Sequence, residues 1–169
     1  MHHGATLLRR AAETAVAAEC GPVVVVLGSD VESLRREVAG LPVRIAENPH
    51  AAEGLATSVR TGLDALCERG EPDAVLFIPC DQPLLTPSVL RAIVARFGAS
   101  RPTAVACSYA GTVGVPALFS RVLFAELRAL RGDRGAKRVL ERHAAETVTV
   151  PFEPAGLDVD TPEDAARLE

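Results

Sequence analysis

The sequence predicts one α/β domain built around a mostly parallel sheet. Two runs, Val23 to Leu27 and Ala74 to Ile78, are entirely apolar, as expected of strands buried on both faces of such a sheet. Helical patterns alternate with strand patterns along the chain, which favours right-handed crossovers between parallel strands. The length of 169 residues suits a single domain with a sizeable core, so we expect one domain over residues 1–169.

The first half of the chain alternates helix and strand. An apolar stripe at helical spacing precedes Gly21-Pro22, and helical spacing returns after Gly54. The elements expected here are a helix from Thr6 to Glu19, a strand from Val23 to Leu27, a helix from Val31 to Val38, a strand from Val43 to Ala46, and a helix that begins at Leu55.

The second half continues the pattern with more turns. Thr86-Pro87 resembles a helix N-cap followed by proline at the first helical position. The expected elements are a strand from Ala74 to Ile78, a helix from Pro87 to Phe97, a strand from Thr103 to Ser108, a brief extended segment from Pro116 to Phe119, a helix from Arg121 to Leu130, a turn from Arg131 that becomes a helix ending at Leu140, and a strand from Thr147 to Val150.

Composition excludes several classes of function. The formal net charge is −4, and the basic residues are spread along the chain, so nothing favours nucleic acid or an anionic membrane. No apolar run approaches the ~20 residues of a membrane span, and the first ten residues lack the order of a signal peptide. The four cysteines form no CxxC pair. We expect a cytoplasmic protein.

Asp81 lies just beyond the apolar run that ends at Ile78. Ligands of open α/β sheets bind at the carboxyl ends of the strands, so Asp81 is a candidate site residue. It can equally be an ordinary turn residue.

Gly54 stands where a loop becomes a helix, with Thr57 and Ser58 in the first turn. Free backbone N–H groups at such a junction can hold an anion, although a plain helix cap explains the same pattern. The basic run that contains Arg131, Arg134, Lys137 and Arg138 similarly suits either phosphates or a solvated charged face.

Asp158 and Asp160 occupy alternate positions before a Thr-Pro helix start. Alternation places both carboxylates on the same side of an extended segment. Together with Asp81 they offer the hard oxygen ligands that Mg²⁺ takes, leaving room for water and substrate phosphates. Helix capping is the alternative role for these aspartates.

Four segments together resemble the molybdenum-cofactor nucleotidyltransferases. They run in order over nearly the whole chain, and the set is specific although each piece alone is weak. The resemblance is strongest to the cytidylyltransferase branch of the MobA-like group. The segments are Asn48-Pro with Glu53-Gly-Leu-Ala-Thr-Ser, Asp81-Gln-Pro-Leu-Leu-Thr-Pro, Gly132-Asp-Arg-Gly-Ala, and Leu157-Asp-Val-Asp-Thr-Pro-Glu-Asp.

The resemblance implies a Rossmann-like three-layer sandwich of the nucleotide-diphospho-sugar transferase type. It implies transfer of CMP or GMP from an NTP, CTP in preference to GTP, to a molybdopterin-type acceptor, with Mg²⁺ as cofactor and a molybdoenzyme or its chaperone as a partner. Asp81 would be catalytic and bind the metal with Asp158 and Asp160. The substrate-binding residues would be Gly54, Ser58, Gln82, Pro83, Gly114, Pro116, Asp133 and Arg134.

Three departures from the family pattern matter. Cys80 stands where the family has glycine, and Val115 replaces a polar residue between Gly114 and Pro116. The usual first strand, with its Gly-rich nucleotide-binding loop, is absent ahead of Gly4. We therefore expect a slot in the sheet between the Val23 and Val75 strands, closed by direct pairing, by another segment, or by residues upstream of an internal Met1.

Three alternatives remain open from the sequence. The enzyme hypothesis predicts that residues 1–169 alone transfer no nucleotide and that extension upstream through a Gly-rich loop restores transfer. A catalytically silent homologue acting as a binding domain is the second alternative. A sugar-phosphate nucleotidyltransferase of related fold is the third.

Overall fold

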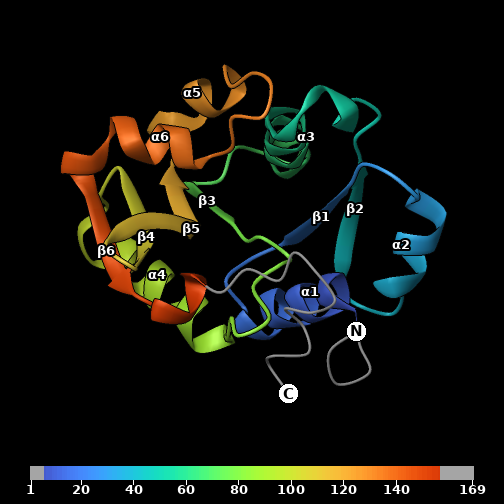
Figure 1. The fold of residues 1–169 in the computed structure, drawn as a ribbon, viewed down its shortest axis with the longest axis horizontal. Coiled ribbons are helices and arrows are strands. Elements are labelled where there is room, and N and C mark those ends of the chain that lie inside the picture. The colour runs from blue at the N-terminus through green and yellow to red at the C-terminus, as the bar shows by residue number, and fades with distance from the viewer. Residues whose placement is uncertain (1–5, 157–169) are drawn as a thin grey trace.

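The computed structural model describes residues 6–156, which alternate between helices and strands (Figure 1). The strands are β1 Val23–Leu27, β2 Val43–Glu47, β3 Ala74–Phe77, β4 Ala104–Tyr109, β5 Thr112–Ser120 and β6 Thr147–Pro151. The α-helices are α1 Leu7–Ala18, α2 Val31–Glu37, α3 Leu55–Cys67, α4 Pro87–Ser100, α5 Phe124–Arg128 and α6 Lys137–Arg142. Short 3-10 helices are η1 Ala51–Glu53, η2 Arg121–Leu123, η3 Ala144–Glu146 and η4 Glu153–Gly156.

The strands form two sheets. β1 and β2 pair in parallel, with Val23 opposite Val43. The larger sheet has the order β3-β5-β4-β6, in which β5 runs antiparallel to both of its neighbours. β4 and β6 are parallel. The α/β class and the parallel pairs confirm the fold that the sequence predicts.

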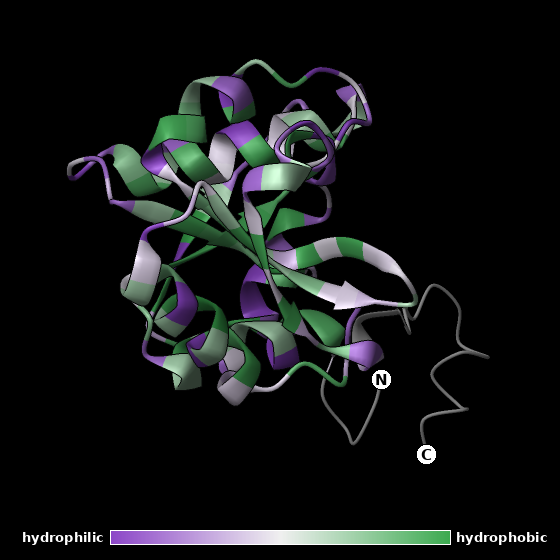
Figure 2. Ribbon diagram, turned by 90° about the vertical axis from the view of Figure 1, so that its left-hand side faces the viewer, coloured by the Kyte–Doolittle hydropathy of each residue, from purple (hydrophilic) through white to green (hydrophobic). Residues whose placement is uncertain are grey.

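The helices form layers on both faces of the larger sheet (Figure 2). Alternate side chains of β4 point to opposite faces because successive residues of a strand alternate. Ala104 and Ala106 pack toward α3, α5 and α6, whereas Val105 and Cys107 pack toward α4. The result is the three-layer arrangement that the family resemblance implies.

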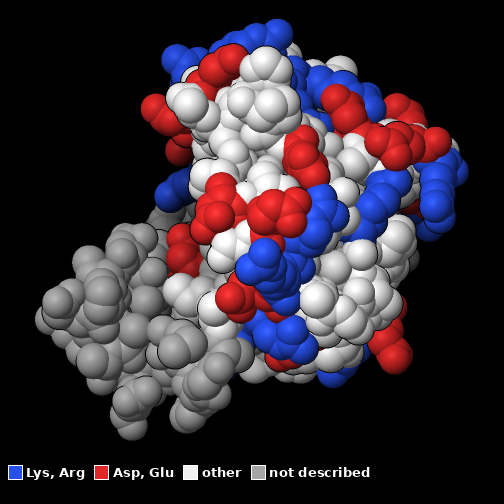
Figure 3. Space-filling model, turned by 90° about the vertical axis from the view of Figure 1, so that its right-hand side faces the viewer, with Lys and Arg blue, Asp and Glu red and all other residues white. Residues whose placement is uncertain are grey.

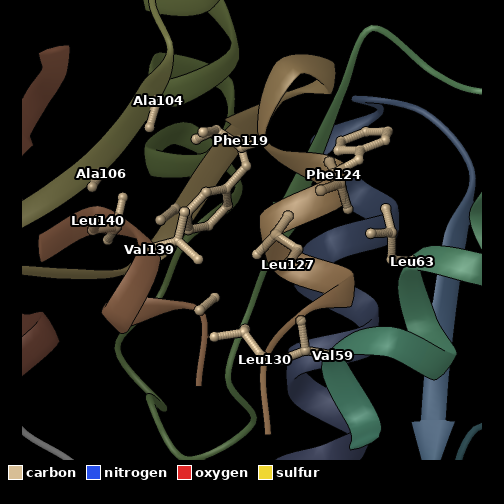
Figure 4. Close-up of a cluster of buried hydrophobic side chains, with 14 of the residues drawn as sticks. Val59, Leu63, Ala104, Ala106, Phe119, Phe124, Leu127, Leu130, Val139 and Leu140 are labelled. Atoms are coloured by element: carbon tan, nitrogen blue, oxygen red, sulfur yellow. The ribbon is translucent and has the colours of Figure 1, made fainter. Parts of the chain in front are cut away.

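The core under α5 is the larger of these clusters (Figure 4). Phe119 of β5 and Leu127 of α5 have no exposed surface. The Phe119 ring also meets Phe77 of β3 edge to face, with the ring centroids 5.7 Å apart. This cluster joins α3 to the larger sheet.

Leu127→Ala should destabilise the protein by about 2–5 kcal/mol, because it removes buried methyl groups and leaves a cavity. Val122→Ala is the control, since Val122, three residues after Phe119, is 73% exposed. We expect its effect to stay within ~0.5 kcal/mol. Urea unfolding of the two variants measures the difference, and similar losses would contradict this assignment of the core.

Two expected elements differ from the structure. The brief segment from Pro116 to Phe119 is the end of a nine-residue strand, β5, in the interior of the sheet. Proline is tolerated there because the register shifts: Ala106 pairs with Ala117 but Cys107 pairs with Gly114, which leaves Pro116 in a bulge. The helix expected from Arg121 to Leu130 is a 3-10 turn followed by the short α5.

The sequence predicts a slot between β1 and β3, which can be compared with the pairing of these strands. The two strands do not pair directly, since they belong to different sheets. Within residues 6–156 no other strand lies between them. Of the three ways of closing the slot that the sequence leaves open, direct pairing of the two strands is therefore wrong.

Candidate active site

Asp81 follows the carboxyl end of β3, in the turn that leads to α4. It is partly buried, and its oxygen Oδ1 has almost no exposed surface. Thr86 and Pro87 begin α4 as the sequence predicts, with Pro87 in the first turn. The local sequence thus ends a buried strand, presents a carboxylate and starts a helix within ten residues.

The Asp81 turn is held from two sides. Gln82 is 7% exposed, and its Nε2 donates to the carbonyl of Val115, 3.3 Å away. Arg10, from α1, donates through Nη2 to the carbonyl of Pro83 at 3.1 Å. Sequence reasoning missed Arg10, because nothing in its local pattern announces a partner 73 residues away.

Gly114 and Pro116 lie on β5 beside this turn. The Val115–Pro116 peptide bond is cis. A Cβ at Gly114 would lie 2.3 Å from Oη of Tyr109, so glycine allows the Tyr109 ring to cover the strand. The hydrogen bond from Gln82 to the carbonyl of Val115 joins the Asp81 turn to this stretch of β5.

Gly54 lies against the Gly132 turn. Its φ is +109°, and a Cβ there would lie 2.4 Å from the carbonyl carbon of Gly132 and 2.7 Å from the nitrogen of Asp133. The N–H of Ala56 donates to the carbonyl of Gly132 at 3.0 Å. Two predicted site segments, 78 positions apart, are thus in direct backbone contact.

The first turn of α3 offers fewer free N–H groups than the sequence suggests. Ala56 donates to Gly132, and the N–H of Thr57 donates to the carbonyl of Gly54 at 3.1 Å. These two donors are therefore occupied within the protein. Of the two interpretations that the sequence leaves open at Gly54, these bonds favour the plain helix cap.

Asn48 organises the loop before α3. It is 2% exposed, and its Nδ2 donates to Oγ1 of Thr57 at 2.8 Å and to Oγ of Ser58 at 3.0 Å. Its Oδ1 accepts from the N–H of His50 at 3.1 Å, while the Thr57 hydroxyl donates toward the carbonyls of Gly54 and His50. Buried polar groups that are satisfied in this way fix a loop in one conformation.

Asn48→Ala should cost about 2–4 kcal/mol of stability, because it removes three side-chain hydrogen bonds of a buried residue at once. Ser58→Ala removes a single acceptor of the same network and should cost about 1 kcal/mol. Chemical unfolding of both variants tests this order. A smaller loss for Asn48→Ala than for Ser58→Ala would show that the network is not organised around Asn48.

Asp133 and Arg134 are exposed in the turn beside Gly54. Of the neighbouring basic residues, Arg138 pairs with Glu141 at 2.9 Å, and Arg131 donates to the carbonyl of Leu130. On the face that carries β2 and α2, basic and acidic side chains are interspersed (Figure 3). The Arg35–Glu47 and Arg44–Glu68 ion pairs account for part of that mixture.

The predicted site residues therefore fall into two groups. One group joins Asp81, Gln82 and Pro83 to β5, and the other joins Gly54 and Ser58 to the Gly132 turn. Asp158 and Asp160 lie outside the described residues. Within residues 6–156 no group of three His, Cys, Asp or Glu side chains could hold a metal ion. In the same range no helix has both the length and the apolar character to cross a membrane.

In open α/β sheets, a carboxylate at the carboxyl end of a strand lies where ligands bind. A family model for the MobA-like NTP transferase domain matches residues 1–148. The chain belongs to this family, whose members and structural neighbours are nucleotidyltransferases.

Individual relatives agree with the family assignment. Nicotine blue oxidoreductase from Paenarthrobacter nicotinovorans is 28% identical over 179 residues, covering 99% of this chain and 84% of that protein. The crystal structure of Rv0371c from Mycobacterium tuberculosis H37Rv matches with a TM-score of 0.82 and 26% identity, over 99% of this chain and 85% of that one. A manganese complex of Rv0371c matches with a TM-score of 0.78 and 27% identity, over 99% and 88% of the two chains.

Molybdopterin-guanine dinucleotide biosynthesis protein A from Archaeoglobus fulgidus shares the fold at a TM-score of 0.71. It is 18% identical, and the match covers 100% of this chain and 86% of that one. At this identity the likeness concerns the fold alone.

Proposed function

We propose that the protein transfers CMP or GMP from a nucleoside triphosphate to a phosphorylated, molybdopterin-type acceptor and releases pyrophosphate. The observation that carries the proposal is the Asp81 turn. A carboxylate with one buried oxygen stands at the end of β3, and Arg10 and Gln82 hold its turn from two elements. Strand ends are where open α/β sheets bind ligands.

In this proposal, each group of site residues contacts a different part of the two substrates. Gly54 and Ser58 would contact the nucleotide or the acceptor. Asp133 and Arg134, in the adjoining turn, would lie on the acceptor side. Gln82, Pro83, Gly114 and Pro116 would shape the pocket beside Asp81. The close contact of Gly54 with Gly132 supports a shared boundary between the two substrates.

A divalent cation fits the chemistry of Asp81, because a carboxylate is the hard oxygen ligand that Mg²⁺ prefers. We assign Asp81 together with Asp158 and Asp160 to this ion. When bound, Mg²⁺ would neutralise the charge of the triphosphate and of the leaving pyrophosphate. The manganese complex of Rv0371c supports divalent-metal binding within the family.

The reaction needs positioning more than proton transfer. An oxygen of the acceptor phosphate would attack the α-phosphorus in line, and the bond from that phosphorus to the pyrophosphate oxygen would break. The acceptor is already anionic, so no general base is required. The residues of the chain would orient the two phosphates and exclude competing water.

CTP is the nucleotide that we favour over GTP, and a molybdoenzyme or its chaperone is the recipient that we propose for the product.

The triphosphate also needs several N–H donors to replace its hydration. Two donors of the first turn of α3 are occupied within the protein, so they do not supply this cradle.

The test measures pyrophosphate release and transfer of label from CTP or GTP labelled at the α-phosphate. The 169-residue chain is assayed beside a form that is extended at its amino end by a strand and a Gly-rich loop. With magnesium or manganese and the pterin acceptor, transfer of the label by either form supports the proposal. A sugar phosphate in place of the pterin is the matched control. Failure of both forms with both nucleotides would contradict the proposal, and preference for the sugar phosphate would reassign the acceptor.

A second candidate follows from one relative, which is named an oxidoreductase and is 28% identical to this chain. Reduction of a redox dye by a supplied electron donor, catalysed by the protein without pyrophosphate release, would favour this second activity. Pyrophosphate release without dye reduction would exclude it.

A further inference from the structure

The chain that follows α5 is held against α3 at two points. Leu130 is 3% exposed and belongs to the same core cluster as Val59 of α3 (Figure 4). Nη1 of Arg60, also on α3, donates to the carbonyl of Leu130 at 2.6 Å. Two residues further on, the carbonyl of Gly132 accepts from the N–H of Ala56 at 3.0 Å. The start of the Gly132 turn is therefore fixed relative to α3.

Two guanidinium groups converge on the carbonyl oxygen of Leu130. Nη1 of Arg60 lies 2.6 Å from this oxygen, and Nη1 of Arg131 lies 2.7 Å from it. The two nitrogens are therefore close neighbours around one atom. Like charges at such a separation repel each other, and the dipole of one carbonyl group offsets that repulsion only in part. An anion placed beside both groups would remove it.

No carboxylate of the described residues supplies that anion. Asp64 of α3 and Glu71 both pair with Arg128, at 2.9 Å and 3.4 Å. Within residues 6–156, Arg60 and Arg131 form no ion pair. The turn that follows contains one acid, Asp133, and one base, Arg134, so it adds no net charge.

Each of the two arginines keeps one edge of its guanidinium group free. Their hydrogen bonds use Nη1 alone, and Nη1 of Arg131 also donates to the carbonyl of Arg128 at 3.0 Å. Nε and Nη2 of Arg60 and Arg131 donate to no protein group in the part of the chain that the structure describes. This edge presents two parallel N–H groups, which match two oxygens of a phosphate or a carboxylate.

Backbone donors of the Gly132 turn lie beside these groups. Gly132 has a φ of +63°. Among residues 6–156, no backbone group accepts from the N–H of Gly132 or of Asp133. Successive N–H groups in a turn with one residue of positive φ form a concave site that suits an anion.

We propose that Arg60 and Arg131, together with the backbone of Gly132, bind one phosphate monoester beside the Gly132 turn. A phosphate dianion has three terminal oxygens and two charges, which match two guanidinium edges, whereas a carboxylate satisfies one edge only. Binding needs neither a metal ion nor a nucleoside triphosphate, so it can be measured apart from nucleotidyl transfer. Under the proposed function the phosphate would be one carried by the acceptor, and this last assignment alone rests on that function.

The probe is phenyl phosphate, titrated into the 169-residue chain in the presence of EDTA and at low salt. NMR of the backbone amides and of the arginine Nε–H groups follows the binding. We expect saturable shifts at Arg60 Nε–H, at Arg131 Nε–H and at the Gly132 amide, and weaker binding as salt is added. Benzoate is the matched control ligand, and we expect it to bind at least about tenfold more weakly.

Three variants assign the site. Arg131→Gln removes an exposed side chain and should weaken phenyl phosphate binding about tenfold without disturbing the fold. Arg60→Lys keeps the charge but loses the planar fork, and should weaken binding as well. Arg96→Gln, which neutralises an exposed arginine of α4, should leave binding unchanged. Absence of saturable binding, equal losses for Arg96→Gln and Arg131→Gln, or shifts confined to the Asp81 turn would each overturn the proposal.

Discussion

Asp81→Asn should reduce nucleotidyl transfer by about a thousandfold or more, because it removes the charge assigned to metal binding while keeping the shape of the side chain. The fold should be unchanged, since the turn around Asp81 is held through Gln82 and through the carbonyl of Pro83. Transfer is measured in whichever form of the protein releases pyrophosphate, and thermal unfolding checks the fold.

Asp73→Asn is the control for this experiment. Asp73 precedes the same strand, is exposed, and pairs with Arg101 and Arg121. The Arg101 hydrogen bond is the main cause that lowers the pKa of Asp73, so its carboxylate is charged at neutral pH, as that of a metal ligand would be. We expect transfer by Asp73→Asn at the wild-type rate. If Asp81→Asn retained more than a tenth of wild-type transfer, Asp81 would not be the essential carboxylate.

Gly54→Ala should destabilise the protein by about 2–5 kcal/mol and separate the two loops of the site. The added Cβ would lie 2.4 Å from a backbone carbon of Gly132, which has no flexible side chain that could move aside. The φ of +109° adds backbone strain of about 1–3 kcal/mol. Urea unfolding measures the total loss.

Gly70→Ala is the control that separates the backbone strain at positive φ from the steric clash with Gly132. Gly70 has a φ of +111°, nearly the same as Gly54, but a Cβ there would meet nothing within 4 Å among the described atoms. This variant should show only the strain, about 1–3 kcal/mol. Equal losses at the two positions would mean that the clash between the added Cβ and the Gly132 backbone costs no stability.

The sequence predicts most of the fold because its signals are local. Val23 to Leu27 and the run beginning at Ala74 are apolar throughout and are strands in the structure. The sequence predicts only a part of β5, because Gly114 and Pro116 interrupt its pattern, and the full strand depends on pairing with two neighbouring strands. That pairing joins residues far apart in the chain, which no local pattern contains.

The candidate site divides in the same way. Asp81 follows a predictable strand, and Gly54 stands at a predictable junction of loop and helix. The structure adds their partners, namely Arg10 for the Asp81 turn and Gly132 for Gly54. The contact of Arg10, on α1, with the Asp81 turn is not visible in any periodic pattern of the sequence. The roles assigned to the site residues remain predictions, and Asp158 and Asp160 lie outside the described residues.

The backbone hydrogen bond between Ala56 and Gly132 has a consequence for cooperative binding of the two substrates. If the loop at Gly54 binds one substrate and the turn at Gly132 binds the other, ordering either loop also restrains its neighbour. Thermodynamic linkage then requires that each substrate raise the affinity for the other by the same factor. The affinity of each of the two loops for its substrate would then depend on whether the other loop is occupied.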